Sequence, residues 1–188
     1  MHKKSQNRVR LQAGKWRGRS IAFPDVDGVR PTKSMVKETL MSWLRPTITR
    51  MHCIDLFAGS GSLTFELASQ GARSVVALDK NPLVYRALVK AQEDLQADNV
   101  TVGRWEYPQL PSEYARGYDL VLLDPPFGLL AGEAILRWVA DTSLVAVGGL
   151  VYLELAENEP WPVFPGWESL KHKKSGGVQF GLVLRVAG

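Results

Sequence analysis

The sequence is poor in the residues that form disulfides and metal sites. Cys53 is the only cysteine among 188 residues, so no disulfide can form within the chain. The three histidines, His2, His52 and His172, are scattered, and together with one cysteine they show no metal-ligand spacing. We therefore expect neither a disulfide framework nor a metal centre.

Long apolar runs are also missing. No stretch approaches the roughly 18 apolar residues that a membrane-spanning helix needs. The first residues, MHKKSQNRVR, are basic, but no apolar segment of about 7–15 residues follows them, as it would in a secretion signal. Together with the single cysteine, these absences favour a protein of the reducing cytoplasm, away from membranes, and we expect a monomer.

Charge is unevenly distributed along the chain. Residues 1–50 contain 12 Lys and Arg against 3 Asp and Glu, a net charge of +9, whereas residues 51–188 contain 11 against 16, a net charge of −5. A basic segment joined to a mildly acidic body is typical of a protein that binds nucleic acid, although a solvated basic tail gives the same count. We therefore expect a basic, nucleic-acid-binding arm over residues 1–28 and a main domain over residues 29–188.

The basic segment has the pattern of a short β-hairpin. Residues 9–23, VRLQAGKWRGRSIAF, mix apolar and basic positions, with Gly14 near the expected bend. Trp16 stands between Lys15 and Arg17, an arrangement that is typical of nucleic-acid surfaces. Packing of the same ring against the main domain is an equally good interpretation.

Residues 28–44 change to a helical period. Apolar side chains at the spacing i, i+4, i+7 and i+8 share one face of the expected helix: Val36, Leu40, Trp43 and Leu44. Pro31 and Thr32 suit the start of this helix, and Pro46 ends it. Arg30, which precedes a proline, should be extended, either contacting a phosphate or pairing with a carboxylate.

From residue 51 onwards, apolar strands alternate with helices. This alternation predicts a parallel sheet that is covered on both faces. The last two strands are joined only by Ser-Gly-Gly, which is too short for a parallel crossover, so they should pair antiparallel. The expected strands are 52–57, 74–79, 99–103, 118–124, 148–156, 167–174 and 178–186, and the expected helices are 62–70, 81–96 and 130–144.

The first of these strands leads into the glycine turn DLFAGSGS, which indicates a nucleoside cofactor. Gly59 and Gly61 permit a tight turn and close approach of a ligand, and Asp79, at the end of the next strand, suits a ribose diol. The dinucleotide pattern G-x-G-x-x-G is incomplete, because Thr64 replaces the third glycine. Asp55 would repel a pyrophosphate, so the cationic, phosphate-free S-adenosylmethionine fits better than NAD.

The fourth strand ends in Asp-Pro-Pro-Phe, which is similar to the catalytic tetrapeptide of methyltransferases that act on exocyclic amines of bases. Such an amine is a poor nucleophile because its lone pair is delocalised into the ring. Asp124 and the carbonyl of Pro125 can accept hydrogen bonds from the amine and aim its lone pair at the methyl group. Phe127 offers a face on which an extruded base can stack.

Four motifs occur in the order seen in the bacterial RsmD-like family: GKWRGRSI, RPTKSMVKETLMSWL, DLFAGSGSLTFE and DPPF. The resemblance runs from about Arg10 to the C-terminus. It implies an S-adenosylmethionine-dependent methyltransferase that modifies the N2 amine of one guanine (guanine 966 in the family's naming) in 16S ribosomal RNA of the small subunit. The implied fold is an α/β, Rossmann-like class I methyltransferase. It has a mostly parallel seven-stranded sheet, an antiparallel C-terminal hairpin and a small N-terminal β-hairpin extension.

The resemblance also assigns residues to roles. The cofactor would be bound by Asp55, Phe57, Gly59, Gly61, Asp79, Lys80, Arg104 and Trp105. The target base would be held by Asp124, Pro125, Pro126 and Phe127, and the RNA by Lys15, Trp16, Arg17, Arg19, Arg30 and Thr32. One departure concerns the third strand, after which such enzymes often place Asp or Asn near the adenine. Here Arg104 and Trp105 follow it, and Trp105 either stacks on adenine or belongs to the core.

The motifs of the sequence are also compatible with other functions. An adenine-N6 methyltransferase shares the tetrapeptide but usually has a separate target-recognition region, and a glutamine-N5 enzyme more typically has Asn in place of Asp124. A NAD-dependent oxidoreductase is disfavoured by the incomplete glycine pattern. A non-catalytic RNA-binding assembly factor is disfavoured by the intact Asp79 and Asp124.

Overall fold

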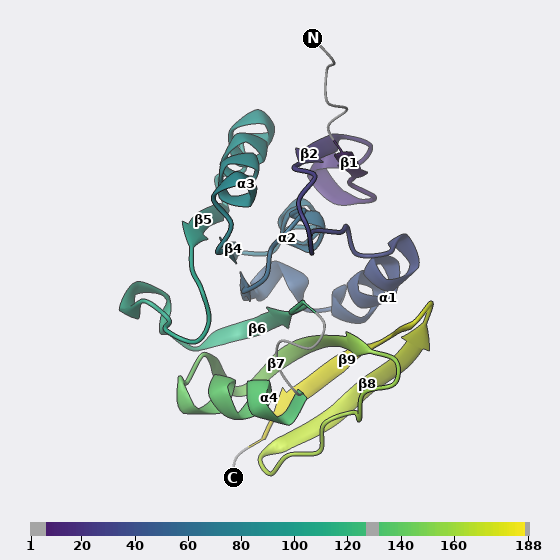
Figure 1. Ribbon diagram of the computed structural model, residues 1–188, viewed down its shortest axis with the longest axis vertical. Helices are drawn as coiled ribbons and strands as arrows, with labels where there is room; N and C mark the ends of the chain where they lie inside the picture. Colours follow the sequence, from purple (N-terminus) through teal and green to yellow (C-terminus); the bar gives the residue numbers. More distant parts are fainter. Residues whose placement is uncertain (1–6, 127–131, 187–188) are drawn as a thin grey trace.

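A seven-stranded mixed sheet forms the centre of the protein (Figure 1), in a computed structural model that describes residues 7–126 and 132–186. The strand order is β5-β4-β3-β6-β7-β9-β8, and the first five of these strands are parallel. The strands are β3 (His52–Asp55), β4 (Ser74–Asp79), β5 (Val100–Arg104), β6 (Tyr118–Leu123), β7 (Val145–Ala156), β8 (Trp167–Ser175) and β9 (Val178–Arg185). The predicted parallel sheet and antiparallel C-terminal hairpin are thus confirmed.

The C-terminal hairpin enters the sheet in reverse order. β9 pairs with β7 and lies inside the sheet, whereas β8, which precedes it in the chain, forms the edge. Burial accounts for this order: the apolar β9 is buried over most of its length, whereas β8 with its lysines is almost entirely exposed. Lysines on an edge strand also discourage pairing with another chain.

Helices cover both faces of the sheet. The core on one face joins it to α1 (Ser34–Leu44), α2 (Ser62–Ser69) and α3 (Pro82–Leu95). The core on the opposite face joins it to α4 (Gly132–Asp141), as Figure 1 shows. Short 3-10 turns lie at Gly14–Trp16 (η1), Ile48–Arg50 (η2) and Ser112–Tyr114 (η3). Among the described residues, no helix is both long enough and apolar enough to cross a bilayer.

Helix α1 starts slightly later than the sequence predicts. Its apolar face is as expected, because Val36, Leu40 and Leu44 are buried. The helix begins at Ser34 rather than at Pro31 or Thr32, since Lys33 is still extended, with ψ of 138°. The three residues before the helix therefore form a loop.

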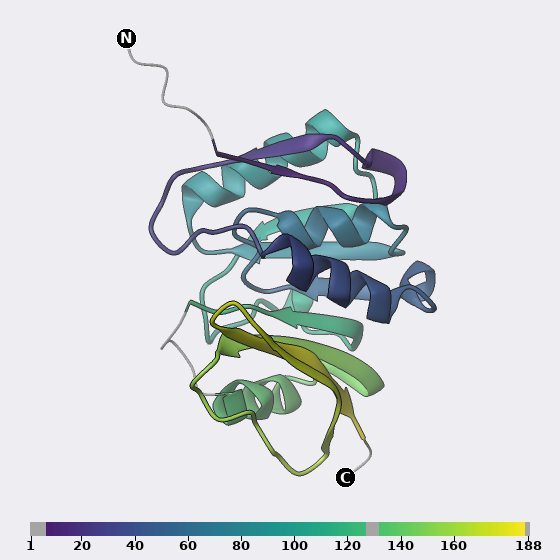
Figure 2. The same cartoon turned by 90° about the vertical axis from the view of Figure 1, so that its right-hand side faces the viewer.

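The predicted N-terminal hairpin packs along the outer side of α2 and α3 (Figure 2). Its strands β1 (Asn7–Arg10) and β2 (Ser20–Phe23) pair antiparallel, and η1 forms the bend. Leu11, Trp16 and Ile21 belong to the same core cluster as α1, α2 and α3. The hairpin is thus anchored to the domain by a shared core.

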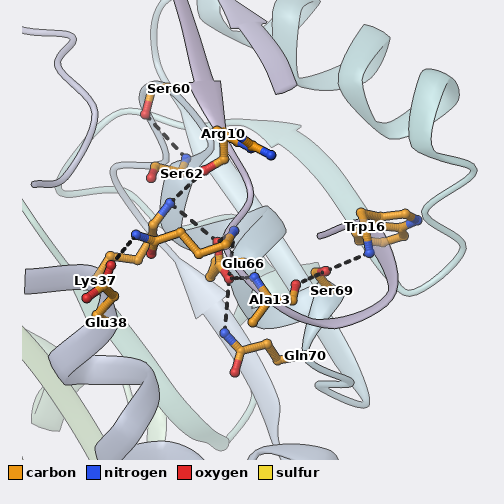
Figure 3. A network of polar contacts seen from close by, with 11 residues as sticks. Arg10, Ala13, Trp16, Lys37, Glu38, Ser60, Ser62, Glu66, Ser69 and Gln70 are labelled. Atoms are coloured by element: carbon orange, nitrogen blue, oxygen red, sulfur yellow. Dashed lines mark hydrogen bonds and ion pairs between the residues drawn. The ribbon is translucent and has the colours of Figure 1, made fainter. Parts of the chain in front are cut away.

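A buried ion pair connects this hairpin with two helices (Figure 3). Lys37 of α1 and Glu66 of α2 lie 3.3 Å apart with side chains 2% and 0% exposed. Glu66 also accepts hydrogen bonds from the backbone N–H groups of Gln12 and Ala13, each at 2.9 Å, and Lys37 donates to the carbonyl of Arg10 at 3.1 Å. The pair thereby satisfies backbone groups as well as charges, which a buried pair requires.

Candidate active site

Four carboxylates lie at the carboxyl ends of four neighbouring parallel strands. Asp79 and Asp55 end β4 and β3, Asp124 directly follows β6, and Glu154 lies near the end of β7. The chain passes from β3 through β4 to β5 on one side of the sheet, then returns to β6 on the other side of β3. Ligands of open α/β sheets bind outside the strand ends at such a reversal of strand order.

Two adjoining cavities open at this reversal. The smaller, of about 160 Å³, lies by the ends of β4 and β5, and the larger, of about 560 Å³, lies between the ends of β3, β6 and β7 and the start of α1. The larger volume is within the range typical of small-molecule sites. Both cavities are lined by Gly28, Val29, Phe57, Gly59, Asp124 and Pro126. The cleft therefore has two compartments with Asp124 at their junction.

The glycine turn and Asp79 form one hydrogen-bonded unit. The N–H of Gly59 donates to Oδ2 of Asp79 at 3.0 Å, and the N–H of Asn81 donates to Oδ1 at 2.8 Å. Burial raises the pKa of Asp79, although both hydrogen bonds oppose this. Gly59 has a positive φ of 49° and lines both cavities. The carboxylate is thus fixed at the position that suits a ribose diol.

Gly61 forms part of the predicted tight turn, but it does not line the cleft. It has φ of 75° and precedes α2, and an added Cβ would lie 2.8 Å from Leu88 and 2.9 Å from Phe65. It is not among the residues that line either cavity. Gly61 is needed for the turn and for packing of the helix beneath it.

Asp55 is a buried carboxylate, 3% exposed, that lines the larger cavity. Burial raises its pKa to about 7, against the lowering effect of a hydrogen bond from the hydroxyl of Thr64 at 2.7 Å. Thr64 occupies the position of the missing third glycine, so this replacement positions the acid. A cation that binds beside Asp55 would favour the ionised form of this carboxyl.

The smaller cavity has an aromatic wall. Trp105 is 5% exposed, contacts Phe57 edge to face with ring centroids 5.7 Å apart, and stacks on Trp138 at 5.6 Å. It belongs to the core and also lines the cavity, so the core interpretation is confirmed and stacking on adenine stays a prediction. Arg104 is exposed, donates to the carbonyl of Lys80, and does not line either cavity.

The charged rim of this cavity includes a residue that the sequence interpretation missed. Lys80 lines the cavity and pairs with Glu106 at 3.3 Å, and both side chains are largely exposed. Glu106, two residues after β5, also lines the cavity. An acid therefore does follow the third parallel strand, one residue beyond Trp105.

Asp124 differs from the other acids because no hydrogen bond to its side chain occurs among the described residues. Burial, and then the negative charges of Glu154 and Asp55, raise the pKa of Asp124 well above its usual range. Pro125 and Pro126 follow it and line the larger cavity, whereas Phe127 lies outside the described residues. Asp124 is a half-buried acceptor that faces the cleft.

The cleft brings together most of the residues that the sequence analysis assigned to the cofactor and the base, but few of those assigned to RNA. Cavity-lining residues among them are Asp55, Phe57, Gly59, Asp79, Lys80, Trp105, Asp124, Pro125, Pro126, Arg30 and Thr32. The residues that do not line it are Gly61, Arg104, Lys15, Trp16, Arg17 and Arg19.

The cleft lies at the carboxyl ends of the parallel strands, and the bend of the N-terminal hairpin lies near their opposite ends. The N–H of Trp16 donates to the Ser69 hydroxyl at 3.0 Å, at the end of α2 (Figure 3), whereas Ser62 and Leu63 at the start of α2 line the larger cavity. Lys15 and Arg17 are exposed at this distant edge. Trp16 is 4% exposed and packs in the core, so its ring offers no free face to a base.

Two further residues of the larger cavity, Glu154 and Lys33, were missed by the sequence analysis. Glu154 was hidden in the run LVYLELA, which was interpreted only as a buried strand. A carboxylate near the end of the last parallel strand was the signal that could have found it. Among the described residues, no group of three or more His, Cys, Asp or Glu side chains is arranged to hold a metal ion.

Comparisons with known proteins identify the family of this chain. The sequence model of a family described as "Conserved hypothetical protein 95" matches residues 9–184. Ribosomal RNA small subunit methyltransferase D of Haemophilus influenzae is 34% identical over 95% of this chain and 94% of its own length. The chain belongs to the RsmD family. Its fold is that of class I methyltransferases, and the family is one of methyltransferases.

A second curated relative and a solved structure are similar to this chain to the same extent. Ribosomal RNA small subunit methyltransferase D of Escherichia coli is 34% identical, over 95% of this chain and 91% of that protein. The solved structure of yhhF from Escherichia coli is 33% identical, with a TM-score of 0.86 over 97% of this chain and 100% of that one. The similarity therefore includes both the N-terminal hairpin and the cleft.

Proposed function

We propose that this chain transfers a methyl group from S-adenosylmethionine to the exocyclic N2 amine of a guanine in 16S ribosomal RNA of the small subunit. One observation carries the proposal: Asp124, an acceptor without a hydrogen bond among the described residues, lies where the two compartments of the cleft meet. One compartment suits a nucleoside cofactor, and the other suits a base.

The first, smaller compartment suits the adenosine part of S-adenosylmethionine. The Asp79 carboxylate, fixed by the N–H groups of Gly59 and Asn81, suits the ribose, and the wall that contains Phe57 and Trp105 suits the adenine. Asp55 lines the adjoining larger cavity, into which the methionine part would extend, and there it suits the positive charges of this part and would repel a pyrophosphate. When bound, S-adenosylmethionine supplies an electrophilic methyl group on a sulfonium.

The second compartment supplies acceptors for the amine of the target base. Asp124 and the Pro125 carbonyl accept the two N–H groups, which localises the nitrogen lone pair and directs it toward the cofactor compartment. The amine must lose one proton when its nitrogen gains a carbon. The ionised carboxylate of Asp124 can take it, and the burial that raises the pKa of this carboxyl makes the ionised form a stronger base. Phe127 remains a predicted stacking surface.

The RNA substrate is supported by the names of the relatives and by charge. The proteins from Haemophilus influenzae and Escherichia coli are named for the small-subunit ribosomal RNA. Of the residues predicted to contact RNA, Arg30 and Thr32 line the larger cavity and are retained as contacts near the target base. Lys15, Arg17 and Arg19 could contact RNA only if it extends to the opposite edge of the domain.

The proposal is tested by radiolabelled methyl transfer to small ribosomal subunits from cells that lack this gene, followed by nucleoside analysis. We expect labelled N2-methylguanosine at one position, and label that forms about 10²–10³-fold more slowly with Asp124→Ala. Labelled N6-methyladenosine would show an adenine enzyme in the same fold. Binding to the subunit without any transfer would indicate an assembly factor. Naked 16S RNA is tested in parallel, to find which form is the substrate.

A further inference from the structure

Glu154 lies beside Asp124 and shares its cavity. The register of β6 and β7 pairs Leu122 with Tyr152 and Leu123 with Leu153, so the next positions are Asp124 and Glu154. Neighbouring strands are about 4.8 Å apart, and paired residues point to the same face. Both carboxylates line the larger cavity. Two acceptors thus stand side by side where the base is expected.

The Glu154 side chain is held in place. It is 7% exposed, and the hydroxyl of the fully buried Tyr152 donates to its Oε2 at 2.7 Å. Burial raises the pKa of Glu154, whereas the hydrogen bond from Tyr152 and the positive charge of Lys33 lower it. Lys33 lines the same cavity, where its amine donates to the carbonyl of Gly176. A fixed carboxylate with a nearby cation is suited to recognising one edge of a base.

Guanine presents two adjacent donors on the edge that carries its reactive amine. These are the N2 amine and N1–H, whereas adenine presents a bare N1 lone pair next to its amine. The base 2-aminopurine has the same C2 amine as guanine but no hydrogen on N1. Two adjacent carboxylates therefore match guanine, and one of them would face a lone pair in either of the other bases.

We propose that Glu154 is a specificity-determining residue that accepts N1–H of the target guanine while Asp124 accepts the N2 amine. This inference rests on the proposed function and specifies how its site selects guanine. With a base that lacks N1–H, the buried Glu154 carboxylate would keep its hydrogen bond from Tyr152 but would face the bare N1 lone pair of the base, with no donor from it. Sites built around such a hydrogen bond reject analogues that lack it by factors of about 10⁴–10⁵.

The test varies the target base in the RNA as well as residue 154 of the protein. The methylated position is first located with the wild-type protein. Small subunits are then assembled with ligated 16S RNA that has either guanine or 2-aminopurine there. The ratio of kcat/KM for the two bases is measured for the wild type, for Glu154→Gln, and for Glu157→Gln. Glu157 is a matched control, because it is an exposed glutamate three residues further along the chain.

We expect the wild type and Glu157→Gln to prefer guanine by a factor on the order of 10⁴. The side-chain amide that Glu154→Gln introduces can accept N1–H through its oxygen or donate to a bare N1 through its nitrogen. The preference should therefore fall by at least about 100-fold in this variant. A merely structural role would lower both rates and leave their ratio unchanged.

Two results would overturn the inference. One is an unchanged ratio in a folded Glu154→Gln variant. The other needs no variant: equal methylation of guanine and 2-aminopurine by the wild type. Neither result affects the proposed function, provided that the wild type forms N2-methylguanosine. Conversely, wild-type transfer to an adenine, or none at all, would contradict the proposed function before the base replacement is attempted.

Discussion

The two halves of the cleft differ in how far the chain completes their hydrogen bonding. In the cofactor half, at the ends of β3 and β4, Asp79 accepts two backbone N–H groups and Asp55 accepts the Thr64 hydroxyl. In the base half, at the ends of β6 and β7, Glu154 accepts Tyr152, and Asp124 has no such partner within the described residues. Among the described residues, hydrogen bonds thus hold both acids of the cofactor half, whereas Asp124 of the base half is an acceptor suited to the donors of a base.

The Lys37–Glu66 ion pair connects these halves. Lys37 belongs to α1, whose start borders the base half, and Glu66 belongs to α2, whose start borders the cofactor half. Four groups of variants follow from this comparison, in order of decreasing expected effect, together with a pH dependence.

The largest effect, on stability, is expected from removing the buried Lys37–Glu66 ion pair. Lys37→Met leaves the Glu66 charge buried and unpaired, which typically costs about 3–5 kcal/mol in the free energy of unfolding. Urea denaturation measures this loss. Lys90→Met is the control, because Lys90 pairs with Asp94 at 2.9 Å on the surface with its side chain 73% exposed. That change should cost less than about 1 kcal/mol. Equal losses in both variants would contradict the assigned role.

Asp124→Ala should have the next largest effect, and on the rate of transfer. Removal of one positioned hydrogen-bonding group typically lowers kcat by about 10²–10³, or about 2.7–4 kcal/mol. Asp124→Asn should be milder, because the amide oxygen still accepts one bond. Single-turnover transfer at saturating cofactor measures the rate, and calorimetry should show unchanged binding of S-adenosylmethionine. Full activity of Asp124→Ala would refute the proposed role of this residue.

Asp79→Ala should act in the cofactor half and weaken binding instead. Hydrogen bonds to a charged acceptor are worth about 1.5–3 kcal/mol, so the dissociation constant of S-adenosylmethionine should rise by roughly 10- to 150-fold. Calorimetry measures the change. Unaltered affinity would remove Asp79 from the cofactor site.

Binding of the cofactor should depend on pH through Asp55. The pKa of this carboxyl is about 7, raised by burial, so it is half protonated near neutrality. A cation favours the ionised form, so affinity should rise through this pH and then level off. The dissociation constant should fall about tenfold between pH 6 and pH 8. Asp55→Asn should flatten this profile. If the profile of Asp55→Asn is as steep as that of the wild type, the pH dependence arises from Asp79 or Asp124 instead.

The same pKa has a consequence for stability in the absence of cofactor. Because the folded-state pKa of Asp55 exceeds its unfolded value near 4, this group favours the folded state most at low pH. Its contribution is lost as pH rises from about 4 through about 7. Asp55→Asn should therefore unfold with less dependence on pH over this interval, as followed by thermal denaturation.

The smallest effect is expected at the hairpin bend. Arg17 is exposed at the edge opposite the cleft, whereas Arg30 lines the larger cavity. Arg30→Ala should weaken binding of the subunit and reduce the slope of log affinity against log salt by about one. Arg17→Ala should alter neither. A larger effect at Arg17 would move the RNA path to the hairpin, as the charge distribution alone suggests.

The parallel strands were predictable because their apolar runs are continuous and end in acids or glycines. Asp55, Asp79 and Asp124 could be located for that reason, since the ends of parallel strands meet at one edge. The order of β8 and β9 was harder, because two consecutive strands can enter a sheet either way round. Here the greater burial of β9 decides the order.

The remaining features depend on tertiary contacts that leave little trace in the sequence. Lys37 and Glu66 look like ordinary helix surface residues and are buried only because the N-terminal segment covers them. Trp16 looks like an RNA contact, yet it packs against the end of α2. Glu154 looks like an interruption of a strand until the register places it beside Asp124.

One paired measurement tests the central difference between the halves most directly. Asp79→Asn and Asp124→Asn make the same chemical change on opposite sides of the cleft, and each is assayed for S-adenosylmethionine affinity and for transfer rate at saturating cofactor. Asp79→Asn should lose affinity and retain most of the rate, whereas Asp124→Asn should retain affinity and lose rate. Loss of the same parameter in both variants would contradict the division into a cofactor half and a base half.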